Sequence, residues 1–473
     1  MTFCRKIDSM RDVLDTIVAI ATPPGRGGIG VVRLSGRDAT AIGRSLLRSA
    51  GEFVAGRAQF GYLLDREPGQ ASASVLDEVV TTFFAGPKSY TGEDVLEISA
   101  HGAPVVLEAV VRGAIQLGAR LAEPGEFTQR AFLSGRLDLT QAEAVHDLIS
   151  ATTLHQARVA ASQMGGALSR TVHPSKTELI RLIATLEAGI DFAEDDLDLL
   201  PNSEIESKIA VITLALARLE GSYRYGKALR EGRSLAIVGR PNAGKSSLFN
   251  ALLDRDRAIV TSTPGTTRDV ISERTAFEGI PVEITDTAGI RETTEEIEAL
   301  GIARSREVLA DAALVLLVVD GTSTLDAADT ALLAEIAGRP AIVALNKCDL
   351  VPDKGRTQLI ASMAEIVPGL RAVHVSAQTG EGLEDLRGSI HTALTGEGAV
   401  LDSVFLTSER QHGAVTAARQ SLASADAAIH EQIPHEMILL DLHAALDALD
   451  ALTGTTTTDD VLSLIFSTFC IGK

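Results

Sequence analysis

The hydrophobic period changes twice along the chain, and the first region has mostly strand character. Apolar runs at residues 16–21, 29–34, 75–84 and 95–99 alternate with helical stretches near 38–47 and 104–117. Asp38 is placed to cap the first helix, and Pro104 stands in the first turn of the second. The Gly- and Pro-rich loop 22–28 is either a tight turn or a close approach to a ligand. The pattern predicts an α+β domain over residues 12–127, preceded by a tail, 1–11.

From about residue 128 the period becomes helical. An apolar stripe follows Ser203 and Glu206, which have the spacing of a capping box: Ile205, Ile209, Ile212, Leu216 and Leu219. A second helical region follows residue 400, with a helix at 408–425 and leucines at 439, 442, 446 and 449. Amphipathic helices need partners. We expect one bundle whose halves, 128–229 and 396–473, flank an inserted domain; two separate bundles are the alternative.

The inserted region, 230–395, alternates apolar strands with helical stretches. The expected strands are 235–238, 272–277, 282–285, 314–319, 341–345 and 372–375, with a hairpin turn at Glu278-Gly279. This order predicts a doubly wound sheet with its ligand loops at the carboxyl ends of the strands. The expected fold is therefore multidomain α/β: a doubly wound domain inserted in an all-helical domain and preceded by an α+β domain.

Composition limits the cellular compartment and the kinds of partner that we expect for the protein. Among 473 residues the net charge is −20, and the three cysteines lack metal-ligand spacing. No apolar run approaches the ~20 residues of a membrane span, and the N-terminus lacks a signal-peptide pattern. We expect a cytoplasmic protein in a reducing compartment, without a membrane partner. The negative net charge argues against a broad basic surface that binds nucleic acid. If the protein acts on RNA, a partner or a local basic patch must therefore supply much of the binding.

The segment from Gly239 to Ser246 matches the phosphate-loop pattern G-x-x-x-x-G-K-[ST] directly after an apolar strand. Its glycines let backbone N–H groups point at phosphate oxygens. Lys245 supplies a cation for the β- and γ-phosphates, and the Ser246 hydroxyl is placed to hold Mg²⁺. The pattern also occurs by chance in unrelated proteins, so further motifs must support it.

Four further motifs follow in order, three of them at the ends of expected strands. Asp286 begins DTAG and suits the Mg²⁺ shell, and the Thr267 hydroxyl in GTT can close over the metal. Asp349 in NKCD can accept from both N–H groups of guanine, a pair that adenine lacks. SAQ, ending at Gln378, would contact the guanine oxygen. Alone, Asp286 or Asp349 would be a surface carboxylate or helix cap; together the motifs predict a GTPase.

The residues predicted to bind GTP come from five loops of this domain. They are Asn242, Ala243, Gly244, Lys245, Ser246, Ser247, Thr261, Ser262, Thr263, Pro264, Gly265, Thr266, Thr267, Asp286, Thr287, Ala288, Gly289, Asn346, Lys347, Asp349, Ser376, Ala377 and Gln378. Ser246 and Thr267 are the predicted Mg²⁺ ligands.

Catalysis needs a group that the DTAG motif does not supply. Ile290 follows it, where Ras-like GTPases place a glutamine that orients water. Asn242 is a candidate ligand for a monovalent cation such as K⁺, with carbonyls of residues 261–266 completing the shell. Asn242 can equally be a turn residue. Arg268 is either an arginine finger or an ion-pair residue of the switch loop.

The chain resembles the tRNA-modification GTPases of the MnmE/TrmE type over almost its whole length. The stretches that carry the resemblance are 15–36, 90–102, 123–145, the phosphate loop, GTTRDV, DTAGIRE and the C-terminal FCIGK. The resemblance implies a dimerising tetrahydrofolate-binding domain, a helical domain and an inserted G domain. It also implies a K⁺-stimulated GTPase that forms a homodimer and works with an FAD-containing partner, as a heterotetramer. Together they add a carboxymethylaminomethyl-type group to C5 of the wobble uridine, position 34, of certain tRNAs.

The resemblance assigns further residues. Arg33, Glu97, Arg136 and Lys473 fall on its folate-contacting positions, for a 5-formyl- or methylene-tetrahydrofolate; many members have Lys at position 136. Cys470 is its C-terminal thiol, or else a buried small apolar residue. Asn242 falls on the K⁺ ligand and Glu298 on the water-orienting glutamate, although by composition Glu298 is a solvated helix residue. The K⁺ loop comprises Thr261, Thr263 and Thr266. The predicted catalytic set is Glu298, Asn242 and Lys245.

The sequence departs from the family pattern at Pro264, Ala103 and Gln378, which stiffen a loop or loosen guanine stacking without changing the prediction. The alternative function is a regulatory or ribosome-assembly GTPase with docking domains. That class often carries an RNA-binding domain, and no basic RNA-binding pattern follows residue 395. Folate binding, and its dependence on residues 470–473, would separate the two hypotheses.

Overall fold

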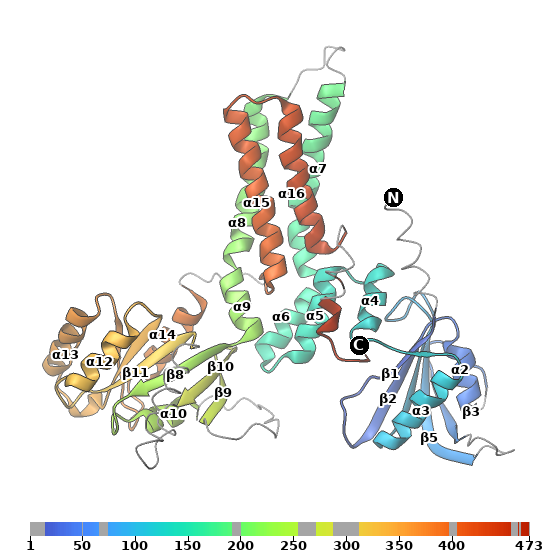
Figure 1. The fold of residues 1–473 in the computed structure, drawn as a ribbon, viewed down its shortest axis with the longest axis horizontal. Coiled ribbons are helices and arrows are strands. Elements are labelled where there is room, and N and C mark those ends of the chain that lie inside the picture. Colours follow the sequence, from blue (N-terminus) through green and yellow to red (C-terminus); the bar gives the residue numbers. More distant parts are fainter. Residues whose placement is uncertain are drawn as a thin grey trace. The chain divides into compact units, whose positions relative to one another are not determined.

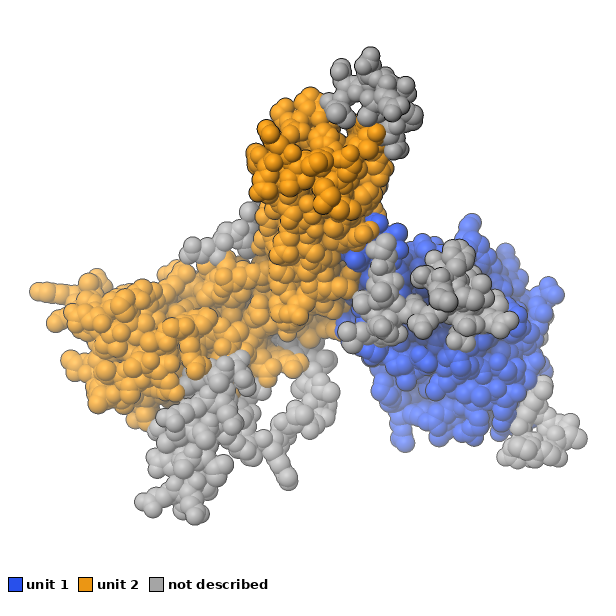
Figure 2. All heavy atoms as spheres, turned by 45° about the horizontal axis from the view of Figure 1, so that its top comes forward, with its two compact units in different colours: residues 1–146, 450–473 blue, residues 147–449 orange. Residues whose placement is uncertain are grey.

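The computed structural model describes residues 15–49, 51–65, 74–191, 200–253, 271–286, 312–396, 404–455, 462 and 465–472. The chain divides into two compact units (Figure 2): residues 1–146 with 450–473 form unit 1, and residues 147–449 form unit 2. Within those described ranges, no helix is both long and apolar enough to cross a membrane.

Unit 1 is built on a seven-stranded sheet in the order β3-β4-β5-β6-β2-β1-β7. Among these strands, neighbours pair antiparallel except for β1 and β7. The strands are β1 (Ile17–Ile20), β2 (Gly27–Ser35), β3 (Leu47–Ser49), β4 (Ala58–Asp65), β5 (Ser74–Phe84), β6 (Val95–Gly102) and β7 (Arg120–Leu121). The helices are α2 (Ala39–Leu46), α3 (Pro104–Gln116), α4 (Glu126–Leu133) and α5 (Leu139–Ser150), whose last four residues belong to unit 2.

The two faces of this sheet differ in what they carry. Side chains alternate along a strand, so Val32 and Leu34 of β2 point to the face covered by α2 and α3 (Figure 1) and are fully buried there. Arg33, between them, points to the opposite face, where Phe127 of α4 lies. A polar residue between two core residues therefore marks the face on which a ligand site can form.

The predicted strands and helices of unit 1 are present, with two local differences. Asp38 stands at the start of α2 but its side chain makes no capping hydrogen bond; instead Arg37 donates to its carboxylate at 3.4 Å. Strands β3, β4 and β7 were not predicted; the longest of them, β4, has the sequence AQFGYLLD, which contains no β-branched residue. It is stabilised by pairing with β5, which is a long-range contact.

The helices of unit 2 before and after the inserted domain pack together (Figure 1). The helices are α6 (Leu154–Met164), α7 (Ala167–Asp191), α8 (Asn202–Gly221), α9 (Tyr223–Glu231), α15 (Glu409–His430) and α16 (His435–Thr453). Lys208 of α8 binds Glu178 of α7 at 2.9 Å. The Thr416 hydroxyl of α15 donates to Glu220 of α8 at 2.6 Å. The two helical regions therefore form one bundle.

The predicted stripe of α8 is buried at all five positions. The predicted capping box is wrong, because α8 begins at Asn202 with Pro201 at its N-cap, which places Ser203 inside the first turn. On α16, Leu442 and Leu449 are fully buried, as are Ile438 and Ala445, whereas Leu439 and Leu446 are half-buried. The buried stripe is thus displaced slightly around the helix from the predicted leucines.

The inserted domain is a six-stranded sheet in the order β13-β12-β11-β8-β10-β9, parallel except for the β9–β10 hairpin. Its strands are β8 (Arg233–Gly239), β9 (Ile271–Phe277), β10 (Ile280–Asp286), β11 (Leu314–Asp320), β12 (Ala341–Asn346) and β13 (Arg371–His374). Its helices are α10 (Lys245–Leu253), α12 (Ala327–Ile336), η2 (Cys348–Leu350), α13 (Asp353–Ile366) and α14 (Leu383–Thr395). Leu235 and Ile237 of β8 pack in one core and Ala236 and Val238 in another, because both faces of the sheet are covered.

The predicted hairpin turn is confirmed and is held by α6. Glu278 and Gly279 have φ values of 50° and 86°, which suit a tight two-residue turn. The Thr153 hydroxyl donates to the Gly279 carbonyl at 2.8 Å. A Cβ at position 279 would lie 2.5 Å from Cβ of His155, so glycine is required for the contact as well as for the turn.

The predicted fold class is confirmed: an N-terminal α+β domain is followed by a doubly wound α/β domain inserted in a helical one. The exact domain boundaries stay predictions. Residues from Asp450 onward belong to unit 1.

Candidate nucleotide and folate sites

The phosphate-loop segment connects the end of β8 to the start of α10. Asn242 and Gly244 adopt left-handed backbone conformations, with φ values of 66° and 92°, which turn the chain around the loop. Lys245 is 8% exposed, and its Nζ donates to the Arg240 carbonyl at 2.8 Å. Because Lys245 begins α10, the N–H groups of the first helical turn face the loop and can bind an anion.

Asn346, at the end of β12, joins three of the predicted motifs. Its Nδ2 donates to the Ala243 carbonyl at 2.9 Å, and its Oδ1 accepts from the backbone N–H of Ala377 at 3.1 Å. Its side chain is 2% exposed. A Cβ at position 244 would lie 2.2 Å from this Nδ2, so only glycine allows the contact. The structure thereby brings together the phosphate loop, NKCD and SAQ.

Lys347 makes a second connection between the guanine motif and the phosphate loop. Its Nζ donates to the Asn242 carbonyl at 3.0 Å and binds Asp320 at 2.6 Å. Burial disfavours the charge of Asp320, but hydrogen bonds from Lys347 and Thr322 lower its pKa below the ordinary value. The sequence interpretation missed Asp320, although its position directly after the strand 314–319 is the signal that identified the other loops.

The remaining described residues of the nucleotide site lie at the carboxyl edge of the sheet. Asp349 lies in η2, and its side chain is exposed. Ser376 is buried, and its Oγ accepts from the N–H of Thr379 at 3.1 Å, which shapes the SAQ loop. Ser246, Ser247 and Gln378 are exposed. These loops lie at the carboxyl edge of the sheet, where doubly wound folds bind their ligands.

Several predicted residues lie outside the described part of the chain. They are Thr261, Ser262, Thr263, Pro264, Gly265, Thr266, Thr267, Arg268, Thr287, Ala288, Gly289, Ile290, Glu298 and Lys473, together with the side chain of Asp286. In the part that is described, no group of three or more His, Cys, Asp or Glu residues could hold a metal ion. A nucleotide-bound Mg²⁺ takes most of its ligands from phosphates and water, so the Ser246 hydroxyl at the start of α10 fits such an ion.

In unit 1, two of the predicted folate residues form an ion pair on the face of the sheet opposite α2 and α3. Arg33 of β2 and Glu97 of β6 are cross-strand partners, with Nη2 and Oε1 2.7 Å apart. The Arg33 guanidinium lies 5.6 Å from the ring centres of Tyr90 and Phe127. Both charged side chains keep about a quarter of their surface exposed, at 22% and 25%. Arg136 is exposed in the turn after α4.

The C-terminal segment of unit 1 runs beside the residues that precede α4. Ile471 forms an antiparallel bridge with Pro124, and the Gly125 N–H donates to the Cys470 carbonyl at 3.4 Å. Phe469 is buried, whereas the Cys470 side chain is exposed. Cys470 is therefore not the buried apolar residue that one interpretation of the sequence offered.

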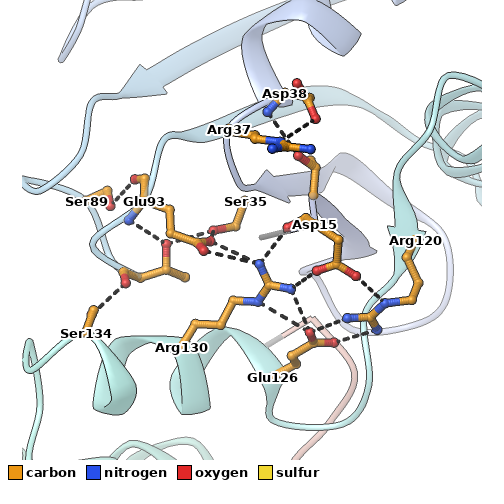
Figure 3. Close-up of polar contacts among 12 residues, drawn as sticks. Asp15, Ser35, Arg37, Asp38, Ser89, Glu93, Arg120, Glu126, Arg130 and Ser134 are labelled. Atoms are coloured by element: carbon orange, nitrogen blue, oxygen red, sulfur yellow. Dashed lines mark hydrogen bonds and ion pairs between the residues drawn. The ribbon is translucent and has the colours of Figure 1, made fainter. Parts of the chain in front are cut away.

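A charge network in unit 1 surrounds the buried Arg130 (Figure 3), and the sequence interpretation did not anticipate it. Arg130 of α4, only 3% exposed, lies 2.5 Å from Asp15, 2.9 Å from Glu126 and 3.3 Å from Glu93. Arg120 binds Asp15 and Glu126 at 2.7 and 2.6 Å. Each carboxylate is thus paired, and the network, Arg130 with Asp15, Glu93, Arg120 and Glu126, fixes α4 to the sheet.

Comparisons with known proteins agree with this organisation. A family model described as the MnmE helical domain matches residues 139–470, and one described as the GTP-binding protein TrmE N-terminus matches residues 16–136. The tRNA modification GTPase MnmE of Koribacter versatilis is 53% identical over 463 residues, covering 97% of this chain and 99% of that protein. The proteins of the same name from Geobacter metallireducens and Roseiflexus sp. are 42% and 41% identical, with the same coverage.

Proposed function

This chain belongs to the tRNA modification GTPase MnmE family and is a GTP hydrolase, and we propose that it modifies the wobble uridine of certain tRNAs. With a flavin-containing partner, it adds a carboxymethylaminomethyl-type group to C5 of uridine 34, using a one-carbon unit from tetrahydrofolate. The observation that carries the GTPase part is Asn346, whose side chain bonds both the phosphate loop and the SAQ loop. Family membership favours this function over that of a ribosome-assembly GTPase.

Different loops of the described domain would bind the phosphates and the base of GTP. Lys245 exchanges the Arg240 carbonyl for the β- and γ-phosphates, and the first turn of α10 donates N–H groups to them. Asp349 accepts from the N–H groups of guanine and gives the site its preference over adenine. Ser246 would hold Mg²⁺ together with the predicted ligand Thr267, and the ion would supply positive charge to the phosphates.

A K⁺ ion fits beside the phosphate loop at Asn242. This residue has an exposed side chain and a left-handed backbone, so its amide oxygen can turn toward the phosphates. Thr261, Thr263 and Thr266 would supply the other ligands, and Glu298 would orient the attacking water. The cation would supply positive charge where an arginine finger acts in other GTPases.

Tetrahydrofolate fits the face of unit 1 that carries Arg33 and Glu97. The Glu97 carboxylate can accept from the N–H groups of a pterin ring, and the rings of Tyr90 and Phe127 border the same position. Arg136 and Lys473 would bind the acidic end of the ligand, and the exposed Cys470 thiol is available for chemistry. We expect a cytoplasmic homodimer that forms a heterotetramer with the flavoprotein and binds tRNA largely through it.

The potassium mechanism is tested by steady-state GTP hydrolysis in KCl and in NaCl at equal ionic strength. Wild type should hydrolyse GTP faster in KCl by at least about tenfold, and Asn242→Ala should lose that difference. Gln378→Ala, in another loop of the same site, serves as a matched control that should keep the K⁺ dependence. Equal wild-type rates in both salts would contradict the potassium mechanism while leaving the GTPase assignment intact.

A further inference from the structure

Arg240, the second residue of the phosphate loop, binds one short segment of the same domain with its whole guanidinium. This segment, residues 320–329, runs from the end of β11 to the start of α12. Nη1 of Arg240 forms an ion pair with Asp326, and Nε lies 2.9 Å from Asp329. Nη2 donates to the Ser323 hydroxyl at 3.1 Å. Arg240, Ser323, Asp326 and Asp329 are not among the residues predicted to bind GTP.

The two carboxylates of the segment that bind Arg240, Asp326 and Asp329, are themselves held in place by α12. Asp326 caps α12, accepting from the N–H groups of Ala328 and Asp329 at 2.9 Å each. Asp329 completes the capping box and is only 2% exposed at its side chain. A single exposed ion pair would contribute little, but here a planar, forked cation contacts three groups of one segment.

Arg240, whose side chain binds this segment, also contacts the phosphate-binding lysine through its backbone carbonyl. The carbonyl of Arg240 accepts from Lys245 Nζ at 2.8 Å, so restraining the Arg240 side chain also restrains the acceptor of that lysine. The other end of the segment begins with Asp320, which binds Lys347, and Lys347 donates to the Asn242 carbonyl. The segment therefore holds the phosphate loop at two points.

We propose that Arg240 is a positioning residue that fixes the phosphate loop in its binding conformation through its contacts with Asp326, Asp329 and Ser323. The inference rests on the proposed nucleotide site, and it identifies a residue that holds the phosphate loop in place before the nucleotide binds. Without these contacts, part of the binding free energy would go to ordering the loop, and nucleotide affinity would fall.

The test is a titration of the full-length protein with a fluorescent GDP analogue. Arg240→Gln should raise Kd about tenfold, and Arg240→Lys should recover only part of the loss, because an ammonium cannot meet all three groups. Asp326→Asn should weaken binding less, and the double variant no more than Arg240→Gln alone, since both changes remove the same contact. The matched control is Arg274→Gln, whose guanidinium is 62% exposed and 3.8 Å from Glu283; it should bind as wild type does.

The thermal midpoint of the nucleotide-free protein separates positioning from stability alone. The proposal expects Arg240→Gln to keep this midpoint within about 2 °C of wild type while its GDP affinity falls. A lowered midpoint with unchanged affinity, or wild-type behaviour in both measurements, would overturn the role of Arg240. If Lys245→Met also bound GDP as tightly as wild type, the proposed nucleotide site itself would be wrong.

Discussion

Two buried cations, Arg130 in the charge network of unit 1 and Lys245 in the phosphate loop of unit 2, have different partners. Arg130 is surrounded by three carboxylates and is almost fully buried. Lys245, also buried, rests on the backbone carbonyl of Arg240, and Lys347 bonds the Asn242 carbonyl as well as a carboxylate. A cation on a carbonyl can exchange it for a phosphate, whereas one among carboxylates loses too much by leaving them. Burial alone does not distinguish the two; the partners do.

The largest effect is expected at Lys245, on activity. Lys245→Met should lower the rate of GTP hydrolysis by on the order of a hundred- to thousandfold, because the phosphates lose their closest cation. The midpoint of thermal unfolding without nucleotide should fall less than in Arg130→Met, because the Lys245 ammonium donates to a backbone carbonyl, whereas Arg130 pairs with three carboxylates. Steady-state phosphate release and calorimetry measure the two. A large loss of stability would mean that Lys245 resembles Arg130 and that the comparison fails.

Arg130 should show the opposite pattern. Arg130→Met leaves Asp15, Glu93 and Glu126 without their central partner and should lower the free energy of unfolding by about 3–5 kcal/mol. GTP hydrolysis measured below the transition should stay near wild type. Arg37→Met is the matched control, because the Arg37–Asp38 pair is exposed and should contribute less than about 1 kcal/mol (Figure 3). Equal effects of the two substitutions in calorimetric scans would show that the network is not structural.

The smallest effect is expected from acid. Burial disfavours the charges of Asp15 and Glu126, but hydrogen bonds from Arg120 and Arg130 lower the pKa of each below its ordinary value of 3.8 or 4.5. Their stabilisation is fully present above those ordinary values and is lost as pH falls through the lower pKa values of the folded protein. The unfolding midpoint should therefore fall more steeply below pH 4.5 in wild type than in Arg130→Met. Parallel midpoint curves for the two proteins would contradict this.

The sequence by itself determined the elements and the nucleotide chemistry. Its apolar periods located the strands of the inserted sheet, the stripe of α8 and the Glu278-Gly279 turn, since each depends on residues close together in the chain. The motif order indicated the guanine nucleotide, because the phosphate loop, DTAG, NKCD and SAQ each follow a parallel strand and the carboxyl ends of these strands reach the same edge. Residue spacing predicted the start of α8 incorrectly, because the helix begins one residue before Ser203. It also did not predict β4, which is a strand because it pairs with β5.

Only the tertiary structure decided which charged residues meet. Asp15 and Arg130 are 115 residues apart, and Arg240 of the phosphate loop meets Asp329 in the first turn of α12, so no local pattern pairs them. The exposure of Cys470 likewise depends on the path of the last residues beside Pro124. Hydrophobic burial is periodic and can be recognised along a chain, but an ion pair depends on two side chains brought together by the packing of whole elements.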